Sequence, residues 1–541
     1  MKRYFSLTLI TAAVLAGCAT TSITSDDVTK GYNSIQADEI AKHVKVLASD
    51  EFGGRAPSSP GEKLTLDYLT AQFKALGLKP GNGNSFLQEV PLVSLEADSD
   101  MVLKIGGKNY QYKTDMVMGS SRISENQAIE NSELVFVGYG VNAPEYNWND
   151  YEGLDVKGKT VVMLVNDPGF ATKNPDLFTG DAMTYYGRWT YKYEEASRQG
   201  AAGAIIIHET APASYPWSVV ENSWSGEQFG FQKENNNMDR VAVEGWVTTD
   251  VAKELFNKAG LDFDTLKANA AKGAYHVDMG DLTASIKIKN TIKKSISYNF
   301  IATLPGSEKP DEHIIYSAHW DHLGTDKNRK GDQIFNGAHD NATGTAGLIE
   351  VAEAFTKLPK HPSRSMTFLA VTAEEQGLLG SKYYAANPVI AANKTVANIN
   401  MDSLNLLGKV KDISVVGIGK SQMDDLLTTV ALEQGRTISG DPNPSSGGYY
   451  RSDHFAFANM GIPAMYAGGG TQAFDEETAN YRKRMSLVLR GCYHQPCDRY
   501  RDEWDLSGAV QDLQLFYKVG FNISEQEQWP TWNTNSEFQR K

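Results

Sequence analysis

The chain has 541 residues, with 52 Lys and Arg against 66 Asp and Glu, which gives a formal net charge of −14. This length exceeds what a single compact core usually serves, so it predicts more than one domain. The acidic balance, with no basic run after the first residues, argues against nucleic acid as a partner.

The start of the chain has the features of an export signal. Lys2 and Arg3 precede an apolar run over 7–15, which is too short to span a membrane, and then Leu-Ala-Gly-Cys18. Since cleavage after Gly17 would leave Cys18 first, the segment resembles the lipobox of bacterial lipoproteins. We expect Cys18 to carry a lipid that anchors an exported protein to a membrane facing the periplasm or the exterior. An ordinary signal peptide is the alternative.

The elements that follow fall into two patterns. Apolar spacing predicts helices over 37–48 and 64–78, and from about residue 133 short strands and turns predict a separate α/β module. From residue 299 strongly apolar strands alternate with helices as far as residue 467, and an amphipathic helix over 506–524 closes the chain. This alternation predicts a mixed, mostly parallel sheet flanked by helices on both faces.

Acidic and imidazole side chains follow the ends of three predicted buried strands, over 313–317, 366–371 and 395–399. They are His319 with Asp321, Glu374 with Glu375, and Asp402, while Asp340 lies between the first two strands. Ligands bind beyond the carboxyl ends of the strands in open α/β sheets. Because clustered buried carboxylates repel one another, we expect a divalent metal among them. Imidazole and carboxylate ligands suit zinc or a similar ion, and a bridging carboxylate suits two ions.

These residues occur in motifs that resemble, in order, those of the M28 family of co-catalytic zinc peptidases. The motifs are His319-Trp-Asp321, Asp340-Asn-Ala, Glu374-Glu375-Gln-Gly-Leu-Leu-Gly-Ser, the strand-terminal Asp402, and Tyr493-His494. The resemblance covers the helices over 37–48 and 64–78 and nearly all of 298–524. It implies a zinc-aminopeptidase-like phosphorylase/hydrolase fold, an inserted α/β protease-associated domain and a peptide substrate.

The resulting organisation has five parts. They are a lipoprotein signal peptide over 1–17, a tether over 18–34, the catalytic domain over 35–130 and 291–530, and the inserted protease-associated domain over 131–290. The inserted domain is expected to act as a lid or substrate-selection module. The sequence carries no signal for an oligomeric state.

The resemblance also implies roles for single residues. Two zinc ions would share Asp340; His319 and Asp402 would complete one site, and Glu375 and His494 the other. A hydroxide bridging the ions would attack the peptide bond. Glu374 would carry the proton, Asp321 would orient the ring of His319, and Tyr493 would either stabilise the oxyanion or only pack.

Four further histidines are alternatives or exclusions. His454, in Arg-Ser-Asp-His, competes with His494 for the last ligand position. His322 and His339 are left out because neighbouring side chains on an extended chain point to opposite sides. His208, in the inserted module, is expected to be structural.

Cys492 and Cys497 are the remaining cysteines after Cys18. An even pair in an exported, oxidising setting predicts a disulfide, which would fix the turn that carries His494.

We expect an exopeptidase, most plainly an aminopeptidase, because the carboxylates of the site suit a terminal ammonium group. Arg451 is the one cation near these motifs that would favour a terminal carboxylate instead. Alternatives are a carboxypeptidase or dipeptidase of the same fold, a glutaminyl-cyclase-like acyltransferase with a single zinc, and a non-catalytic receptor-like relative. The complete ligand set argues against the last two.

Overall fold

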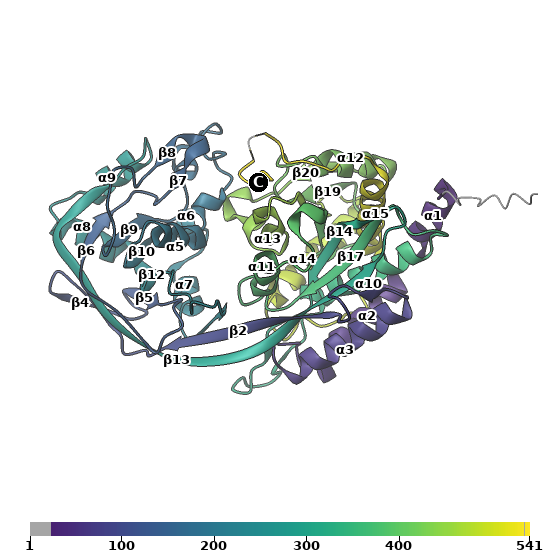
Figure 1. Cartoon of the computed structure of the whole chain (residues 1–541), viewed down its shortest axis with the longest axis horizontal. Helices are drawn as coiled ribbons and strands as arrows, with labels where there is room; N and C mark the ends of the chain where they lie inside the picture. Colours follow the sequence, from purple (N-terminus) through teal and green to yellow (C-terminus); the bar gives the residue numbers. More distant parts are fainter. Residues whose placement is uncertain (1–22, 535, 541) are drawn as a thin grey trace, which may run out of the picture.

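The structure is a computed structural model that describes residues 23–534 and 536–540. The predicted signal peptide and Cys18 lie outside these residues. Figure 1 shows two lobes joined by two long strands, β2 and β13. We call residues 23–97 with 290–540 the larger lobe and residues 98–289 the smaller lobe. Within the described residues, no helix combines the length and apolarity needed to cross a membrane.

The larger lobe is built on a mixed sheet with a parallel centre. Its four central strands lie in the order β17, β14, β18, β21, and antiparallel strands flank them on both sides. The predicted mostly parallel sheet is thereby confirmed. The strands of this sheet are β14 (Lys309–His319), β17 (Arg364–Val371), β18 (Thr395–Asn400), β21 (Ala464–Gly469), β13 (Val277–Leu304), β19 (Asp412–Val415) and β20 (Thr437–Gly440).

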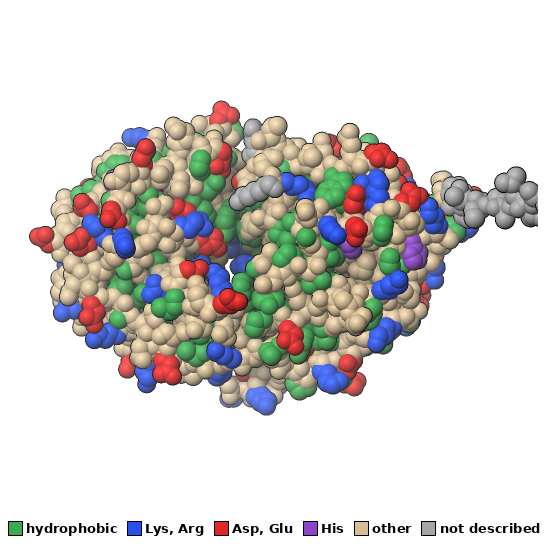
Figure 2. All heavy atoms as spheres, in the orientation of Figure 1, with side chains coloured by type: hydrophobic (Ala, Val, Ile, Leu, Met, Phe, Trp, Pro, Cys, Tyr) green, Lys and Arg blue, Asp and Glu red, His purple; other side chains and the backbone are tan. Residues whose placement is uncertain are grey.

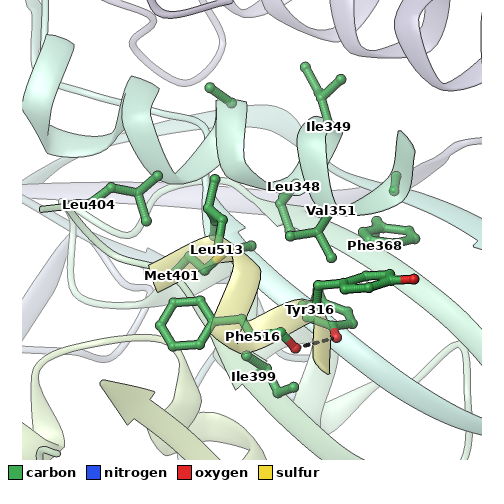
Figure 3. Packing of buried hydrophobic residues seen from close by; sticks show 14 of the residues in the cluster. Tyr316, Leu348, Ile349, Val351, Phe368, Ile399, Met401, Leu404, Leu513 and Phe516 are labelled. Atoms are coloured by element: carbon green, nitrogen blue, oxygen red, sulfur yellow. Dashed lines mark hydrogen bonds between the residues drawn. The ribbon is translucent and has the colours of Figure 1, made fainter. Parts of the chain in front are cut away.

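Helices cover both faces of this sheet, which explains why every residue of β17 is buried. One face packs against α2 (Ala37–Leu47), α3 (Pro60–Ala75), α10 (Thr343–Thr356) and α15 (Ser507–Glu525). The other packs against α11 (Leu379–Ala386) and α13 (His454–Asn459). Figure 3 shows the first face, where Tyr316 stacks on Phe368 and its hydroxyl donates a 2.9 Å hydrogen bond to the Phe516 carbonyl.

The smaller lobe has its own sheet and its own cores on the two sheet faces. Its parallel strands are β6 (Asn126–Phe136), β9 (Thr160–Leu164), β10 (Gly203–His208) and β12 (Val243–Thr248), with α5 (Trp189–Arg198) and α8 (Thr249–Lys258) packed on them. His208 ends β10 and its Nε2 lies 3.0 Å from the Tyr215 carbonyl oxygen, a contact within this lobe.

Of the two connecting strands, β13 pairs with strands of both lobes. Residues 277–289 of β13 pair with β6, residues 290–300 pair with β2 (Leu87–Ala97), and residues 300–304 pair with β17. The hydrogen-bonded ladder therefore runs without a break from one sheet to the other.

The smaller lobe begins earlier than the predicted residue 131. Met101 is already in its core, and β3 (Val102–Ile105), β4 (Lys108–Gln111) and β5 (Met116–Gly119) belong to its sheet. The prediction missed them because strands of four residues carry little periodicity, and the pairings that join them to the rest of the sheet, β3 with β13 and β5 with β12, are distant in the sequence.

The predicted tether is also corrected, because much of it is α1 (Ser25–Ser34). Thr24 caps this helix reciprocally with Asp27, and Val28 and Tyr32 pack against the larger core. A tether was predicted because residues 18–34 are polar and contain few large apolar side chains. The capping box Thr-x-x-Asp is the sequence feature that would have indicated a helix.

Candidate metal centre

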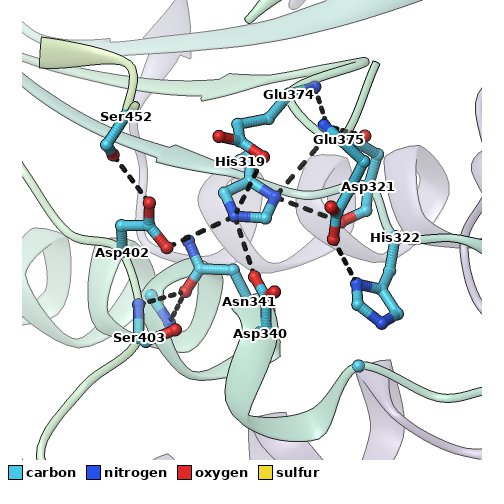
Figure 4. Close-up of polar contacts among 12 residues, drawn as sticks. His319, Asp321, His322, Asp340, Asn341, Glu374, Glu375, Asp402, Ser403 and Ser452 are labelled. Carbon is cyan, nitrogen blue, oxygen red and sulfur yellow. Dashed lines mark hydrogen bonds and ion pairs between the residues drawn. The ribbon is translucent and has the colours of Figure 1, made fainter. Parts of the chain in front are cut away.

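The candidate residues meet at the carboxyl edge of the larger sheet (Figure 4). His319 is the last residue of β14, Glu374 and Glu375 follow β17, and Asp402 follows β18. Asp340 lies in the short kinked segment Ala338–Ala342 that leads into α10. Three parallel strands and one helix start therefore bring together residues that lie far apart in the sequence, as their strand-end positions predict.

His319 faces two carboxylates. Its Nε2 lies 3.2 Å from Asp340 Oδ1 and 3.5 Å from Asp402 Oδ1. Its Nδ1 lies 3.2 Å from the backbone carbonyl oxygen of Asp321, which accepts a hydrogen bond from the Nδ1–H and so leaves the Nε2 lone pair toward the carboxylates. Burial lowers the pKa of His319, but the charge of Glu374 and the contacts with Asp340 and Asp402 outweigh burial and raise it well above its ordinary value.

His494 faces a second pair of carboxylates. Its Nε2 lies 3.2 Å from Asp340 Oδ2 and 3.0 Å from Glu375 Oε2. Burial lowers the pKa of His494, whereas Asp340 and Glu375 raise it, to about 10 in total. Asp340 thus offers one oxygen to each of two histidines. His494 follows α14 (Glu476–Cys492) in a turn that the Cys492–Cys497 disulfide closes.

His322 belongs to this site, contrary to its exclusion on sequence grounds. The ring is fully buried and its Nδ1 lies 2.5 Å from Glu375 Oε1. The exclusion assumed an extended chain, but β14 ends at His319, so strict alternation of side chains ends there too. His339 is in neither ligand group.

The Asp321 side chain has a different contact from the one predicted. Its carboxylate accepts hydrogen bonds from the backbone N–H groups of Glu374 (3.1 Å) and Glu375 (3.4 Å). It lies 3.8 Å from His319 Nδ1, beyond hydrogen-bond range, because the Asp321 backbone carbonyl occupies that position. Burial is the main cause that raises the pKa of Asp321, to about 7. Asp321 therefore fixes the loop that carries both glutamates.

Glu374 lies beside the ligand groups without belonging to either. Its Oε2 is 4.0 Å from His319 Nε2, and burial raises its pKa well above the ordinary value. Tyr493 stacks on His494 with ring centroids 3.8 Å apart, and 59% of its surface is exposed. His454 is buried between Tyr449 and Tyr466, away from both ligand groups.

Two further residues lie near the centre, of which Tyr466 was missed from the sequence, while the loop Phe52-Gly-Gly-Arg55 was expected either to pack beside the site or to be a plain turn. Tyr466, on β21, places its hydroxyl 3.5 Å from the carbonyl oxygen of Asp402. Arg55 is fully buried and its guanidinium donates to the carbonyls of Leu47, Trp320, Asn336 and Gly337, which fixes the backbone on both sides of the site. The position of Tyr466 in a strand gave no functional signal.

Hydrogen bonds behind the carboxylates hold them in place. Ser452 donates to Asp402 Oδ2 at 2.7 Å and accepts from the Asn400 amide at 2.8 Å. The Asp498 carboxylate accepts from the backbone N–H groups of His339 (2.9 Å) and Asp340 (3.1 Å). Outer contacts of this kind orient ligands before a metal binds.

The donor set fits two cations. Potential ligands form two groups that share Asp340, namely His319 with Asp340 and Asp402, and His322 with Asp340 and Glu375. His319 Nε2, His494 Nε2 and Glu375 Oε1 are buried, and their close contacts with the neighbouring imidazoles and carboxylates lack hydrogen-bond geometry. Burial of such atoms is costly unless a cation compensates for it.

Comparison with known proteins agrees with this site. Residues 299–517 match the sequence model of peptidase family M28. This region belongs to peptidase family M28. The protein is therefore a metallopeptidase, which confirms the class predicted from its motifs.

An aminopeptidase of Pseudomonas aeruginosa is 26% identical over 491 residues, which cover 86% of this chain and 76% of that protein. Leupeptin-inactivating enzyme 1 of Streptomyces exfoliatus is 27% identical over 212 residues, covering 38% of this chain and 44% of that protein. The solved aminopeptidase from Aneurinibacillus sp. strain AM-1 has a TM-score of 0.51 at 20% identity, and the match covers 93% of this chain and 97% of that one. The chain therefore shares its fold with that structure, and the predicted fold is confirmed.

Proposed function

We propose that the protein is an exopeptidase of the aminopeptidase type, which uses two zinc ions to hydrolyse the amide bond next to the free N-terminus of a peptide. The observation that carries the proposal is the position of Asp340, with one oxygen 3.2 Å from His319 and the other 3.2 Å from His494. Membership of family M28 supports the peptidase reaction, and the two relatives that are named aminopeptidases support the choice of chain end.

His319, Asp340 and Asp402 would hold one ion, and Asp340, Glu375 and His494 would hold the other. We favour His494 over His322 because its Nε2 lies within 3.2 Å of both carboxylates. His322 contacts Glu375 Oε1 and so supports that ligand from behind. Nitrogen and oxygen ligands without thiolate suit zinc. When bound, the ions would polarise the scissile carbonyl and lower the pKa of a water molecule.

The side chains of the protein supply the proton transfers and the orientation. Glu374 takes a proton from the attacking water and returns it to the leaving amine. Burial suits this role, because a carboxyl with a raised pKa holds a proton more readily. Tyr466, which is partly buried beside Asp402, is better placed than the exposed Tyr493 to hydrogen-bond an oxygen that gains negative charge.

The deciding experiment for the chain end compares one cleaved peptide with its N-acetylated form. We expect acetylation to abolish cleavage, because Glu374 and Asp402 are the carboxylates available to bind an ammonium group. Undiminished hydrolysis would overturn the aminopeptidase proposal. A parallel peptide with an amidated C-terminus separates a carboxypeptidase, which would lose activity on amidation and keep it on acetylation.

The number of ions is tested by elemental analysis of the purified protein. We expect two zinc ions per chain and the loss of both in Asp340→Ala, since Asp340 serves each group. Asp402→Ala should retain one ion. One ion or none in fully active protein would contradict the two-metal proposal and favour a single-zinc, cyclase-like relative.

We also propose that Cys18 anchors the protein to a membrane and that the smaller lobe is a protease-associated domain. The sequence Leu-Ala-Gly-Cys supports the first, and an independent sheet above the site supports the second. Cys18→Ser should release the protein from membranes or block its processing. Unchanged membrane fractionation of a processed variant would contradict the anchor.

A further inference from the structure

A cleft of about 800 Å³ lies between the two lobes and leads to the metal centre. The smaller lobe lines it with Arg188 and Phe229, and the larger lobe lines it with Lys382 and Arg451 as well as with Glu374 and His494 of the centre. Figure 2 shows a hollow between the lobes, with Lys and Arg atoms in blue at its depth. The cleft therefore has an acidic region at the metal centre and a basic region elsewhere on its wall.

Three of the basic residues of this wall, Arg188, Lys382 and Arg451, come from separate elements, while Lys233 and Arg240 pair with Asp239 and Glu244. Arg188 precedes α5 in the smaller lobe, Lys382 lies in α11, and Arg451 directly precedes Ser452, the residue that supports Asp402. Within the part of the chain that the structure describes, no side-chain hydrogen bond or ion pair involves any of the three, and the buried Nε of Arg188 has no partner. For Arg188 and Lys382 this lack of partners is unusual, because partly buried cations are normally paired, whereas Arg451 is exposed.

The acidic groups around these residues do not neutralise their positive charges. Burial, followed by the positive charge of Arg451, lowers the pKa of Arg188 to about 10. Burial likewise is the main cause that lowers the pKa of Lys382, and Arg188 adds to the effect. Glu194, the acidic residue that acts most on Lys382, accepts a 2.6 Å hydrogen bond from the Tyr185 hydroxyl instead.

Two further acidic groups have partners of their own, and Glu374 and Glu375 of the cleft lining belong to the metal centre. Glu244 pairs with Arg240 at 3.1 Å, and Asp453 accepts a 2.5 Å hydrogen bond from Ser381. The basic wall is thus left with an unmatched positive charge in a restricted volume, which favours an anion. Arginine and lysine bind carboxylates through short, charge-assisted hydrogen bonds.

We propose that Arg188, Lys382 and Arg451 form a subsite for a carboxylate of the peptide substrate, downstream of the bond that is cleaved. The inference rests on the proposed aminopeptidase function, in which the N-terminus lies at Glu374 and Asp402 and the rest of the peptide extends along the cleft. In a short peptide this carboxylate is the C-terminus, and in a longer one it is an acidic side chain. The smaller lobe thereby contributes a residue, Arg188, to substrate selection.

The test uses the metal-loaded full chain and measures kcat/KM on matched peptides. The first pair is Leu-Gly-Gly as free acid and as C-terminal amide. The second pair, Leu-Gly-Glu-amide and Leu-Gly-Gln-amide, isolates the side chain as the source of the carboxylate. We expect the charged member of at least one pair to be preferred by about 10- to 100-fold, the range of a charged hydrogen bond. The pair that shows the preference identifies the source.

Two variants locate the effect. Arg188→Gln and Lys382→Gln, in separate lobes, should each raise KM for the charged peptide and reduce the preference, while the neutral peptide and the zinc content stay unchanged. Arg490→Gln, an exposed α14 residue outside the cleft lining, is the matched control and should keep the preference. If one variant fails to fold, the other still tests the subsite.

Equal kcat/KM within both pairs would overturn the subsite and leave the aminopeptidase proposal standing. An undiminished preference in both variants would also overturn it. Failure of the function itself gives a different pattern, in which N-acetylated Leu-Gly-Gly is cleaved as fast as the free peptide.

Discussion

Asp340 determines how the two ligand groups are coupled. Because its two oxygens face different histidines, any shift of this side chain changes both groups together. The backbone N–H of Asp340 donates to Asp498, and the segment leads directly into α10, whose residues are almost all buried. The position of the shared ligand is therefore set by the core of the larger lobe and does not depend on the cleft.

At the same scale, Glu374→Gln should lower kcat by about 10²- to 10⁴-fold, the usual contribution of a general base. Zinc content should stay at the wild-type level, because Glu374 belongs to neither ligand group. Stopped assays with a cleaved peptide and elemental analysis of the same sample measure both quantities.

Glu375→Gln is the matched control for this variant, since it alters the neighbouring residue, which does belong to a ligand group. It should lose zinc as well as activity. A near-normal rate of the Glu374→Gln enzyme would show that Glu374 is not the general base. Loss of zinc from this variant would mean that Glu374 is the ligand and Glu375 the base.

Much of the centre was predictable at the residue scale because ligands at strand ends occur in fixed motifs. His322 and the contact of Asp321 were not, because both depend on how the chain turns after β14, which periodicity does not describe. Arg188 was equally hidden, since its relation to Lys382 arises only when the smaller lobe lies over the cleft.

At the scale of elements, the turn after α14 shows how a short covalent link positions a ligand. Cys492 and Cys497 have Cα atoms 5.2 Å apart, and His494 between them has a φ of 55°, in the left-handed region. A residue other than glycine needs support from its surroundings in that backbone conformation. The disulfide supplies this support and so directs the ring toward Asp340 and Glu375.

The docking of α1 gives a second test at this scale. A Cβ on Gly31 would lie 2.3 Å from the Tyr517 hydroxyl oxygen and 2.7 Å from the Ala354 carbonyl oxygen. Gly31→Ala should therefore destabilise the larger lobe by about 1–3 kcal/mol, the usual effect of overpacking. Urea unfolding followed by tryptophan fluorescence measures the change.

Gly491→Ala serves as the control for Gly31→Ala, because Gly491 also lies in a helix but a Cβ there meets no atom within 4 Å. It should be neutral or more stable by up to about 1 kcal/mol, through helix propensity alone. Equal stability of the two variants would show that α1 is not docked on α10 and α15.

At the scale of the whole molecule, the sequence indicated two folding patterns and an insertion but not its first boundary. The short strands β3, β4 and β5 that begin the insertion explain this result, because strands of four residues carry little periodicity. At the second boundary, the residues of β13 serve three pairings in two sheets, so a single strand passes from one lobe to the other. The path of β13 places the smaller lobe opposite the metal centre. No local sequence pattern indicates which residues of each lobe line the cleft.

The two lobes also predict how metal removal acts on stability. All candidate ligands belong to the larger lobe, whereas the smaller lobe has separate cores and contributes none. A ligand that binds only the folded state stabilises it by RT ln(1 + [L]/Kd), or about 4 kcal/mol at a thousandfold excess over Kd. Removal of zinc by a chelator should therefore lower the melting temperature of the larger lobe by several degrees and leave that of the smaller lobe nearly unchanged.

Differential scanning calorimetry of the full chain, with and without chelator, separates these two transitions. Asp340→Ala is the control: its larger lobe should already melt at the lower temperature, and the chelator should have no further effect. Gly31→Ala assigns the transitions independently, since it should lower the melting temperature of the larger lobe alone. An equal shift of both transitions by the chelator would mean that β2 and β13 couple the lobes into one cooperative unit. No shift in either would contradict metal binding at the shared carboxylate, because an ion held by ligands from three strand ends and a helix start necessarily stabilises the lobe that assembles them.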